Sequence, residues 1–378
     1  MKGLYIHIPF CDHICTYCDF PKLFTKGQRH GEYLDALVKE LELYREQTGF
    51  EQLETVYLGG GTPTALNLDQ LGFLMDYLAA HIDLAGLKEF SVEANPENLT
   101  EEKIDFLLQR GVTRLSLGVQ TFNGRLLETI GRKHRADDVF EAAARLRKRG
   151  FDNFNLDMIY AIPGQTMADL EADLELAVKL GPAHLSAYSL ILEEHTPLYV
   201  AYMKDKAQVA DQDLEADMYE AVMAFMARSG YRHYEISNYT KGAPSRHNLL
   251  YWRNEEYIGA GLGAHGYVAG TRYHNTKSIN RYIQDLSQGR LPIAEAGTVD
   301  LKARVEEEFF LNLRLRQGLD LEAAEAKLGI KTADYYEKTL ARFQEQGLLA
   351  LEGSRLRLTR EGLLLANEVF EAFLLNDD

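Results

Sequence analysis

Apolar and polar positions along the first half of the chain follow two alternating patterns. Short apolar runs rich in β-branched and aromatic residues, each bounded by turn residues, are typical of buried strands, and amphipathic stretches of helical period separate them. The runs predict six strands, at residues 4–8, 55–58, 89–93, 114–118, 153–160 and 184–192. The stretches predict helices at residues 33–44, 68–81, 101–110, 137–149 and 167–180. Helices of this length allow right-handed crossovers, so the pattern predicts an α/β fold with a parallel sheet or a partial barrel.

The alternation stops at about residue 195. Residues 200–290 predict helices and a loop region rich in glycine and aromatic residues that contains 246–252 and 259–266, and we interpret this part as an extension of the barrel. After residues 291–300, which contain a proline and a glycine, three helical patterns precede a hairpin at 348–358 and a final helix. Helices with a small hairpin are typical of a winged helix. We therefore predict two domains, 1–290 and 291–378, the second small, helical and winged-helix-like.

Composition and charge exclude several classes of protein. The chain has 378 residues, of which 46% are hydrophobic, and its net charge of −16 makes nucleic acid an unsuitable partner. The C-terminal domain, from residue 300, holds 11 basic and 16 acidic residues, 11 − 16 = −5, so we expect it to pack or bind a protein partner rather than DNA. No apolar run approaches the roughly 18 residues of a membrane span, which predicts no transmembrane segment.

All three cysteines, Cys11, Cys15 and Cys18, lie on one predicted loop after the first strand, with the spacing CxxxCxxC. An odd, clustered set forms no disulfide framework and indicates a reducing, cytoplasmic environment and a metal or redox site. Three thiolates favour iron–sulfur or zinc. Structural zinc needs a fourth ligand, such as His7 or His13, and the chain has no second cysteine pair. A cubane cluster with one open iron is therefore the favoured interpretation, and zinc stays the alternative.

Other polar residues follow the predicted strands in turn. Residues 59–63, Gly-Gly-Gly-Thr-Pro, end the second strand, where glycine backbone can approach a ligand closely, but no P-loop lysine follows. Glu93, Gln120, Arg132 and Asp157 lie on or after later strands. Because the carboxyl ends of parallel strands meet at one mouth, these side chains can converge there. Mutual pairing, for example of Asp157 with Arg132, is the structural alternative, since an unpaired buried carboxylate is costly.

The cysteine spacing resembles that of the radical S-adenosylmethionine (SAM) superfamily. Similarity to its coproporphyrinogen dehydrogenase (HemN) branch runs from YIHIPFC at 5–11 through GVQTF at 118–122 and DMIY at 157–160 to the C-terminal domain. The resemblance implies a partial (β/α)6 TIM-like barrel and a [4Fe-4S] cluster held by the three cysteines. It also implies that SAM chelates the open iron and accepts an electron from the cluster, which releases methionine and a 5′-deoxyadenosyl radical.

The same resemblance assigns roles to further residues. It implies that Tyr5, Gly60 and Glu93 touch the cluster-bound SAM, with Gly60 and Gly61 near its methionine amino group. It places a second set within reach of the dehydrogenase's second SAM site, namely Gly61, Thr62, Gln120, Arg132 and Asp157.

One position departs from the dehydrogenases, which carry a further cysteine two residues after the third. This chain has Phe20 there. In lacking the further cysteine it resembles the HemW family of heme chaperones. Residues 247–252, His-Asn-Leu-Leu-Tyr-Trp, match the HNxxYW motif of that family. A neutral imidazole such as that of His247 is a good axial iron ligand, and Tyr251 and Trp252 have rings suited to stacking on a porphyrin.

Two functions follow from these residues. The first is a heme chaperone that binds the cluster, SAM and heme and delivers heme to a membrane hemoprotein such as a respiratory cytochrome, with peripheral association at the membrane left open. The alternative is an oxygen-independent coproporphyrinogen III dehydrogenase that uses the 5′-deoxyadenosyl radical. The sequence assigns no catalytic residue.

Overall fold

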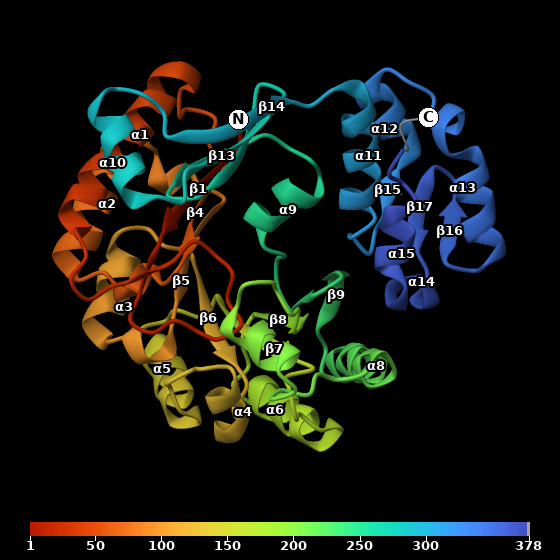
Figure 1. The fold of residues 1–378 in the computed structure, drawn as a ribbon, viewed down its shortest axis with the longest axis horizontal. Coiled ribbons are helices and arrows are strands. Elements are labelled where there is room, and N and C mark those ends of the chain that lie inside the picture. Colours follow the sequence, from red (N-terminus) through yellow and green to blue (C-terminus); the bar gives the residue numbers. More distant parts are fainter. Residues whose placement is uncertain (376–378) are drawn as a thin grey trace.

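A computed structural model of the protein describes residues 1–375, and its centre is a twelve-stranded sheet (Figure 1). The strand order is β14-β13-β12-β11-β1-β4-β5-β6-β7-β8-β10-β9. Six parallel strands follow one another in chain order, β1 (Gly3–Ile8), β4 (Thr55–Gly60), β5 (Glu89–Ala94), β6 (Arg114–Gln120), β7 (Phe154–Tyr160) and β8 (His184–Ser189). They confirm the six predicted strands and the partial (β/α)6 barrel.

Helices connect these strands and cover the outer face of the sheet, as Figure 1 shows for its red to yellow elements. They are α1 (His30–Thr48), α2 (Leu68–His81), α3 (Glu101–Gln109), α4 (Gly124–Thr129), α5 (Ala136–Lys148) and α6 (Met167–Lys179). Three short 3-10 turns lie between them, η1 (Pro63–Ala65), η2 (Leu84–Gly86) and η3 (Pro96–Asn98). The bounds predicted for α2 are those observed, because the side chains of Asn67 and Gln70 form a capping box at its start.

The two faces of each parallel strand differ in polarity. In β1, Leu4, Ile6 and Ile8 are fully buried in the core, whereas the alternate residues Tyr5 and His7 belong to a hydrogen-bonded polar set. Successive side chains of a strand point to opposite faces, so the apolar set packs under the helices and the polar set lines the inside of the partial barrel. The register pairs Tyr5 with Tyr57 across β1 and β4. Side chains from several strands therefore form rings inside the barrel.

The region between residues 197 and 298 is richer in strands than predicted. It contains α7 (Pro197–Met203), α8 (Gln212–Arg228), β9 (Arg232–Glu235), β10 (Asn238–Thr240), α9 (Arg246–Trp252), β11 (Tyr257–Gly261), β12 (His265–Val268), β13 (Thr271–Asn275), α10 (Ile279–Ser287) and β14 (Ile293–Thr298). The loop predicted at 259–266 is wrong, since β11 and β12 occupy most of it and β11 pairs in parallel with β1. A Cβ at Gly259 would overlap the carbonyl of His265, so glycine here permits close approach of strands.

The C-terminal unit, blue in Figure 1, lies beside the large sheet. It consists of α11 (Leu301–Asn312), β15 (Leu319–Asp320), α12 (Leu321–Leu328), α13 (Ala333–Glu345), β16 (Leu349–Glu352), β17 (Arg355–Leu358), α14 (Arg360–Leu364) and α15 (Ala366–Glu371). Its strands form a small sheet in the order β15-β17-β16, with the predicted hairpin between β16 and β17, which fits the winged-helix-like prediction. β14 follows the predicted boundary at 290–291 yet pairs with β13 in the large sheet. The division at that boundary stays a prediction.

Candidate functional site

The cysteine loop lies at the carboxyl ends of the parallel strands. Cys11 ends β2 (Phe10–Cys11), which pairs with β3 (Leu23–Phe24), and the residue is 8% exposed. The loop is tied to the neighbouring crossover, since the Thr16 amide donates to the Ile130 carbonyl at 3.0 Å. Burial raises the pKa of the Cys11 thiol to about 11. Bound metal would therefore be the group that holds this sulfur as a thiolate.

The glycine turn after β4 packs directly on Cys11. A Cβ at Gly61 would lie 2.9 Å from Cys11 Sγ and 2.8 Å from the Phe10 carbonyl oxygen, so glycine leaves this sulfur uncovered. Within residues 1–375, no three Cys, His, Asp or Glu side chains converge as they would around a single ion. A cubane binds each of its three thiolates through a different iron and needs no such convergence. The three-cysteine loop and its glycine cradle thus fit a [4Fe-4S] cluster.

Glu93 stands next to this turn, as predicted for the mouth. Its carboxylate accepts hydrogen bonds from the Tyr57 hydroxyl at 2.8 Å and from the Gly60 amide at 3.0 Å. Burial and the neighbouring charge of Asp157 raise the pKa of Glu93 to about 7. Gly60 has φ +112, and a Cβ there would strike the imidazole of His7. The geometry brings Gly60, Gly61 and Glu93 together beside Cys11.

Tyr5 also lies inside the barrel, but its hydroxyl is already hydrogen-bonded to another residue of the protein. Its hydroxyl lies 3.0 Å from His7 Nδ1, and His7 Nε2 lies 2.7 Å from the Pro21 carbonyl oxygen. Because a carbonyl can only accept, Nε2 carries the proton and Nδ1 accepts from Tyr5. Burial lowers the pKa of His7 to about 4, so the imidazole is neutral at pH 7. His7 therefore positions Tyr5 and anchors the end of the cysteine loop.

The predicted second set divides into two groups. Arg132 Nη1 donates to Asn95 Oδ1 at 2.7 Å, and Asn95 Nδ2 donates to Thr62 Oγ1 at 3.1 Å. Asp157 accepts instead from Ser116 Oγ and Asn155 Nδ2, both at 2.8 Å. The suggested pairing of Asp157 with Arg132 is therefore wrong, because each has other partners.

Gln120 ends β6 beside the first of these groups. It is 6% exposed and has φ +65, an unusual backbone conformation for a residue other than glycine. Its Nε2 would lie 3.2 Å from a Cβ at Gly118, which would also approach Arg132 Nη2 at 2.7 Å. Gly118 thus leaves room for both side chains, so Gln120 and Arg132 lie close together at the mouth.

The HNxxYW residues lie on α9, at the other end of the strands. His247 is fully buried, with Nδ1 2.8 Å from Thr55 Oγ1 and Nε2 2.7 Å from the Tyr251 hydroxyl. Thr55 begins β4, five residues before Gly60 at its end, which corresponds to about 17 Å along a strand. Burial lowers the pKa of His247 to about 3, so the ring is neutral. The structure therefore places His247 at the opposite end of β4 from the cysteine loop, with Tyr57, which donates to Glu93 and contacts the His247 ring, between them.

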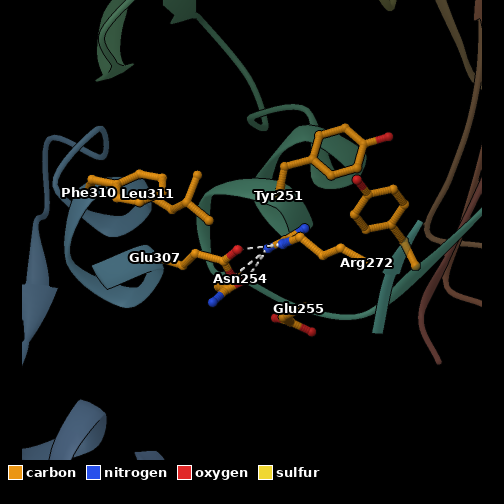
Figure 2. Close-up of a pocket in the computed structure, with 8 residues that line it drawn as sticks. Tyr251, Asn254, Glu255, Arg272, Glu307, Phe310 and Leu311 are labelled. Atoms are coloured by element: carbon orange, nitrogen blue, oxygen red, sulfur yellow. Dashed lines mark hydrogen bonds and ion pairs between the residues drawn. The ribbon is translucent and has the colours of Figure 1, made fainter. Parts of the chain in front are cut away.

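A pocket of about 260 Å³ lies beside α9, between the large sheet and the C-terminal unit (Figure 2). Tyr251 lines it together with Arg272 from β13, whose guanidinium binds both carboxylate oxygens of Glu307 at 2.5 and 2.7 Å and Asn254 Oδ1 at 2.7 Å. Trp252 stands apart from this set, with the Arg314 guanidinium 4.3 Å from its ring centre. Tyr251 thus contacts both His247 and the pocket, while Trp252 packs toward the C-terminal unit.

Comparison with known families gives separate matches for the first part of the chain and for its C-terminal part. Residues 5–177 match the radical SAM superfamily, and residues 299–365 match the HemN C-terminal domain. The heme chaperone HemW of Bacillus subtilis is 44% identical over 376 residues, which cover 99% of each chain. The heme chaperone HemW of Escherichia coli is 33% identical over 98% of each chain.

The chain belongs to the HemW family. Its fold is also that of a solved relative, the coproporphyrinogen III oxidase HemN of Escherichia coli, described as a radical SAM enzyme. That structure superposes with a TM-score of 0.84 at 25% identity and covers 99% of this chain and 90% of the HemN chain. No helix within residues 1–375 combines the length and the apolar character needed to cross a membrane.

Several residues of this HemW-family site were not predicted. Asn95 lies two positions after Glu93, just beyond β5, so the two-residue period of a strand could have indicated it. Tyr57 and Glu89 contact predicted residues from positions with no distinguishing pattern; Glu89 accepts from the backbone amides of Arg246 and His247. These contacts tie Tyr57, Glu89 and Asn95 to predicted residues, and the ligand roles assigned by resemblance stay predictions.

Proposed function

We propose that this HemW-family chain is a heme chaperone that binds a [4Fe-4S] cluster, SAM and heme. Full-length identity of 44% to a protein named heme chaperone HemW is the observation that carries the proposal. Phe20, where the dehydrogenases have a further cysteine, supports it, and this residue is 61% exposed beside the cysteine loop. Heme delivery to a membrane hemoprotein, such as a respiratory cytochrome, and a cytoplasmic location belong to the same proposal.

The cluster would be held by Cys11, Cys15 and Cys18, and it would supply one-electron chemistry to SAM when bound. The chain's own residues fix the surroundings of this loop. Gly61 keeps space open over Cys11 Sγ, and Glu93 holds the turn through the Gly60 amide. The resemblance assigns Gly60 and Glu93, together with Tyr5, to SAM binding, and the position of Gly60 and Glu93 beside this loop supports that assignment.

Heme would be held at the α9 end of the barrel, with His247 binding the iron and Tyr251 and Trp252 providing ring contacts. The Tyr251 hydroxyl occupies His247 Nε2, so coordination through this nitrogen requires that hydrogen bond to break. A hydrogen bond contributes about 1 kcal/mol, which is about fivefold in affinity. Tyr251→Phe keeps a ring for stacking and removes this competitor, so we expect heme to bind about fivefold more tightly.

A heme titration followed by the Soret band tests the proposal. The wild-type chain should give a stoichiometric band, His247→Ala should lose or shift it, and His81→Ala, an exposed histidine at the end of α2, should not change it. A band that His247→Ala leaves unaltered would show that another residue binds the iron. The absence of any band in the wild type would refute the heme chaperone.

A dehydrogenase is the second candidate, favoured by the TM-score of 0.84 to HemN over 99% of this chain. It would oxidatively decarboxylate coproporphyrinogen III, and the second set of residues, Thr62, Gln120, Arg132 and Asp157 with Gly61, would serve a second SAM. Protoporphyrinogen formation in an anaerobic assay with SAM and a reductant would establish it and displace the chaperone.

A further inference from the structure

A line of hydrogen bonds runs from Arg132 to the sulfur of Cys11. Arg132 Nη1 lies 2.7 Å from Asn95 Oδ1, Asn95 Nδ2 lies 3.1 Å from Thr62 Oγ1, and Thr62 Oγ1 lies 3.8 Å from Cys11 Sγ. Thr62 is 3% exposed, so water does not compete freely for its hydroxyl. The four residues come from the cysteine loop, the turn after β4, the end of β5 and the segment between α4 and α5. We call them the Arg132 relay.

Chemistry fixes the direction of the relay. A guanidinium has donors only, so the Asn95 carbonyl oxygen must face Arg132 and the Asn95 amide group must face Thr62. The Thr62 oxygen then accepts from Asn95, and the single hydroxyl hydrogen remains to be donated to Cys11 Sγ. Without Arg132, the Asn95 amide could turn over and the hydroxyl could point away from the sulfur. The relay therefore selects one hydroxyl orientation.

We propose that Thr62 is a positioning residue that raises the reduction potential of the cluster held by Cys11, Cys15 and Cys18, with its hydroxyl directed by Asn95 and Arg132. A hydrogen bond to a ligand sulfur stabilises the more negative, reduced cluster and so raises its potential. This inference rests on the cluster of the proposed function, but not on heme. It also gives Thr62 and Arg132 a task at the first cofactor, in addition to their predicted place at a second SAM.

Dithionite supplies the electron in a redox titration of the reconstituted chain, followed by electron paramagnetic resonance (EPR) without heme or SAM. Thr62→Val removes the hydroxyl and keeps the shape, so the ratio of reduced to oxidised cluster at a fixed potential should fall about three- to tenfold, tenfold being 59 mV for one electron. Thr62→Ser retains the hydroxyl and should restore the wild-type potential. Thr64→Val is the matched control, because Thr64 lies on the same turn, fully buried, and its hydroxyl has no hydrogen-bond partner within residues 1–375.

Asn95→Asp gives a second readout that keeps Thr62 in place. The introduced carboxylate can only accept, so the Thr62 hydroxyl would donate to it and turn away from Cys11. Pulsed EPR in H2O and D2O should then detect one exchangeable proton fewer near the cluster, as in Thr62→Val. A Thr62→Val chain with full iron content and the wild-type potential would overturn the proposal. If that variant assembled no cluster, an undiminished proton signal in Asn95→Asp would overturn it instead.

Heme plays no part in these measurements, so they can fail independently of the proposed function. A chain that binds no heme but shows the shifted potential refutes the chaperone and supports the relay. A chain that binds heme and shows no shift refutes the relay alone.

Discussion

Replacement of Glu89 tests which contacts hold α9, the helix that carries the HNxxYW motif. Glu89 begins β5 and is 5% exposed. Its carboxylate accepts from the Arg246 amide at 2.8 Å, the His247 amide at 3.2 Å and Ser245 Oγ at 3.2 Å, which are the first groups of α9. A carboxylate at this position also compensates the positive end of the helix. Glu89→Ala would leave these donors buried and without an acceptor.

The expected cost follows from these contacts. An unsatisfied buried donor costs about 1–3 kcal/mol, and loss of one member of a buried charged set costs about 3–5 kcal/mol. Burial opposes the charge of Arg114, but the Glu89 carboxylate helps to keep its pKa raised, so the variant also leaves this guanidinium less compensated. We expect the free energy of unfolding to fall by about 3–5 kcal/mol, a large part of the usual 5–15 kcal/mol.

Urea unfolding followed by circular dichroism measures this loss, and hydrogen exchange of the α9 amides shows where it occurs. Glu54→Ala is the matched control, since Glu54 precedes β4 and forms a 2.7 Å ion pair with Lys88 whose side chains are 33% and 50% exposed. Such a pair contributes about 0–1 kcal/mol. A Glu89→Ala chain that loses less than about 1 kcal/mol, with unchanged exchange in α9, would refute the reasoning.

Three further predictions use other parts of the barrel. Gly61→Ala should lower the iron and sulfide content after anaerobic reconstitution, because its Cβ would lie 2.9 Å from Cys11 Sγ. Gly124→Ala is the control, since a Cβ there meets open space and should leave the iron content unchanged. Full iron content in Gly61→Ala would contradict the view that cluster binding needs glycine beside Cys11. Burial raises the pKa of Glu40 from 4.5 to about 7, so the folded state binds this proton more tightly than the unfolded state does. The resulting contribution to the free energy of unfolding is fully present below pH 4.5 and is lost as the pH rises through 7. The wild-type chain should therefore lose about 2–3 kcal/mol more than Glu40→Gln between pH 5 and 8 in urea unfolding, and equal losses would exclude Glu40 as the cause. SAM should leave the heme affinity of the chain unchanged within twofold, because the cysteine loop and His247 lie at opposite ends of β4; strong competition would place both ligands in one mouth.

Local patterns determined which parts of the fold could be predicted. The six parallel strands, β1 and β4 to β8, are short runs rich in apolar residues and bounded by turn residues, so their positions follow from neighbouring residues, as the capping box at Asn67 shows for α2. β11 escaped prediction because its glycines, Gly259 and Gly261, suggest a loop when read alone. Their purpose depends on partners far away in sequence, namely His265 and His7, whose backbone a Cβ would strike. No local pattern carries that information.

In the candidate site, too, the contiguous motifs could be predicted, whereas the hydrogen-bond partners of side chains distant in sequence could not. The cysteine spacing and the glycine turn are contiguous, and the structure brings Cys11 and Gly61 together as their place after neighbouring strands predicts. The partners of Arg132 could not be deduced, because chain order gives the strand that a residue follows and not the atom that its side chain reaches. Asn95 accepts the hydrogen bond from Arg132, although Asp157 had the charge to compete for it. Hydrogen-bond geometry decided between them.

Separation of the two motifs bears on the choice between the two functions. A dehydrogenase must bring the porphyrinogen propionates to the carboxyl ends of the strands, where the cysteine loop and Glu93 lie. A chaperone has no such need, since it binds and releases heme without cutting a carbon bond. His247 lies beside Thr55 at the amino end of β4, about 17 Å along the strand from Gly60, and its ring contacts that of Tyr57, whose hydroxyl donates to Glu93. If His247 binds heme, the heme therefore lies toward the end of β4 that is opposite to the cysteine loop, a place that suits transfer to a partner.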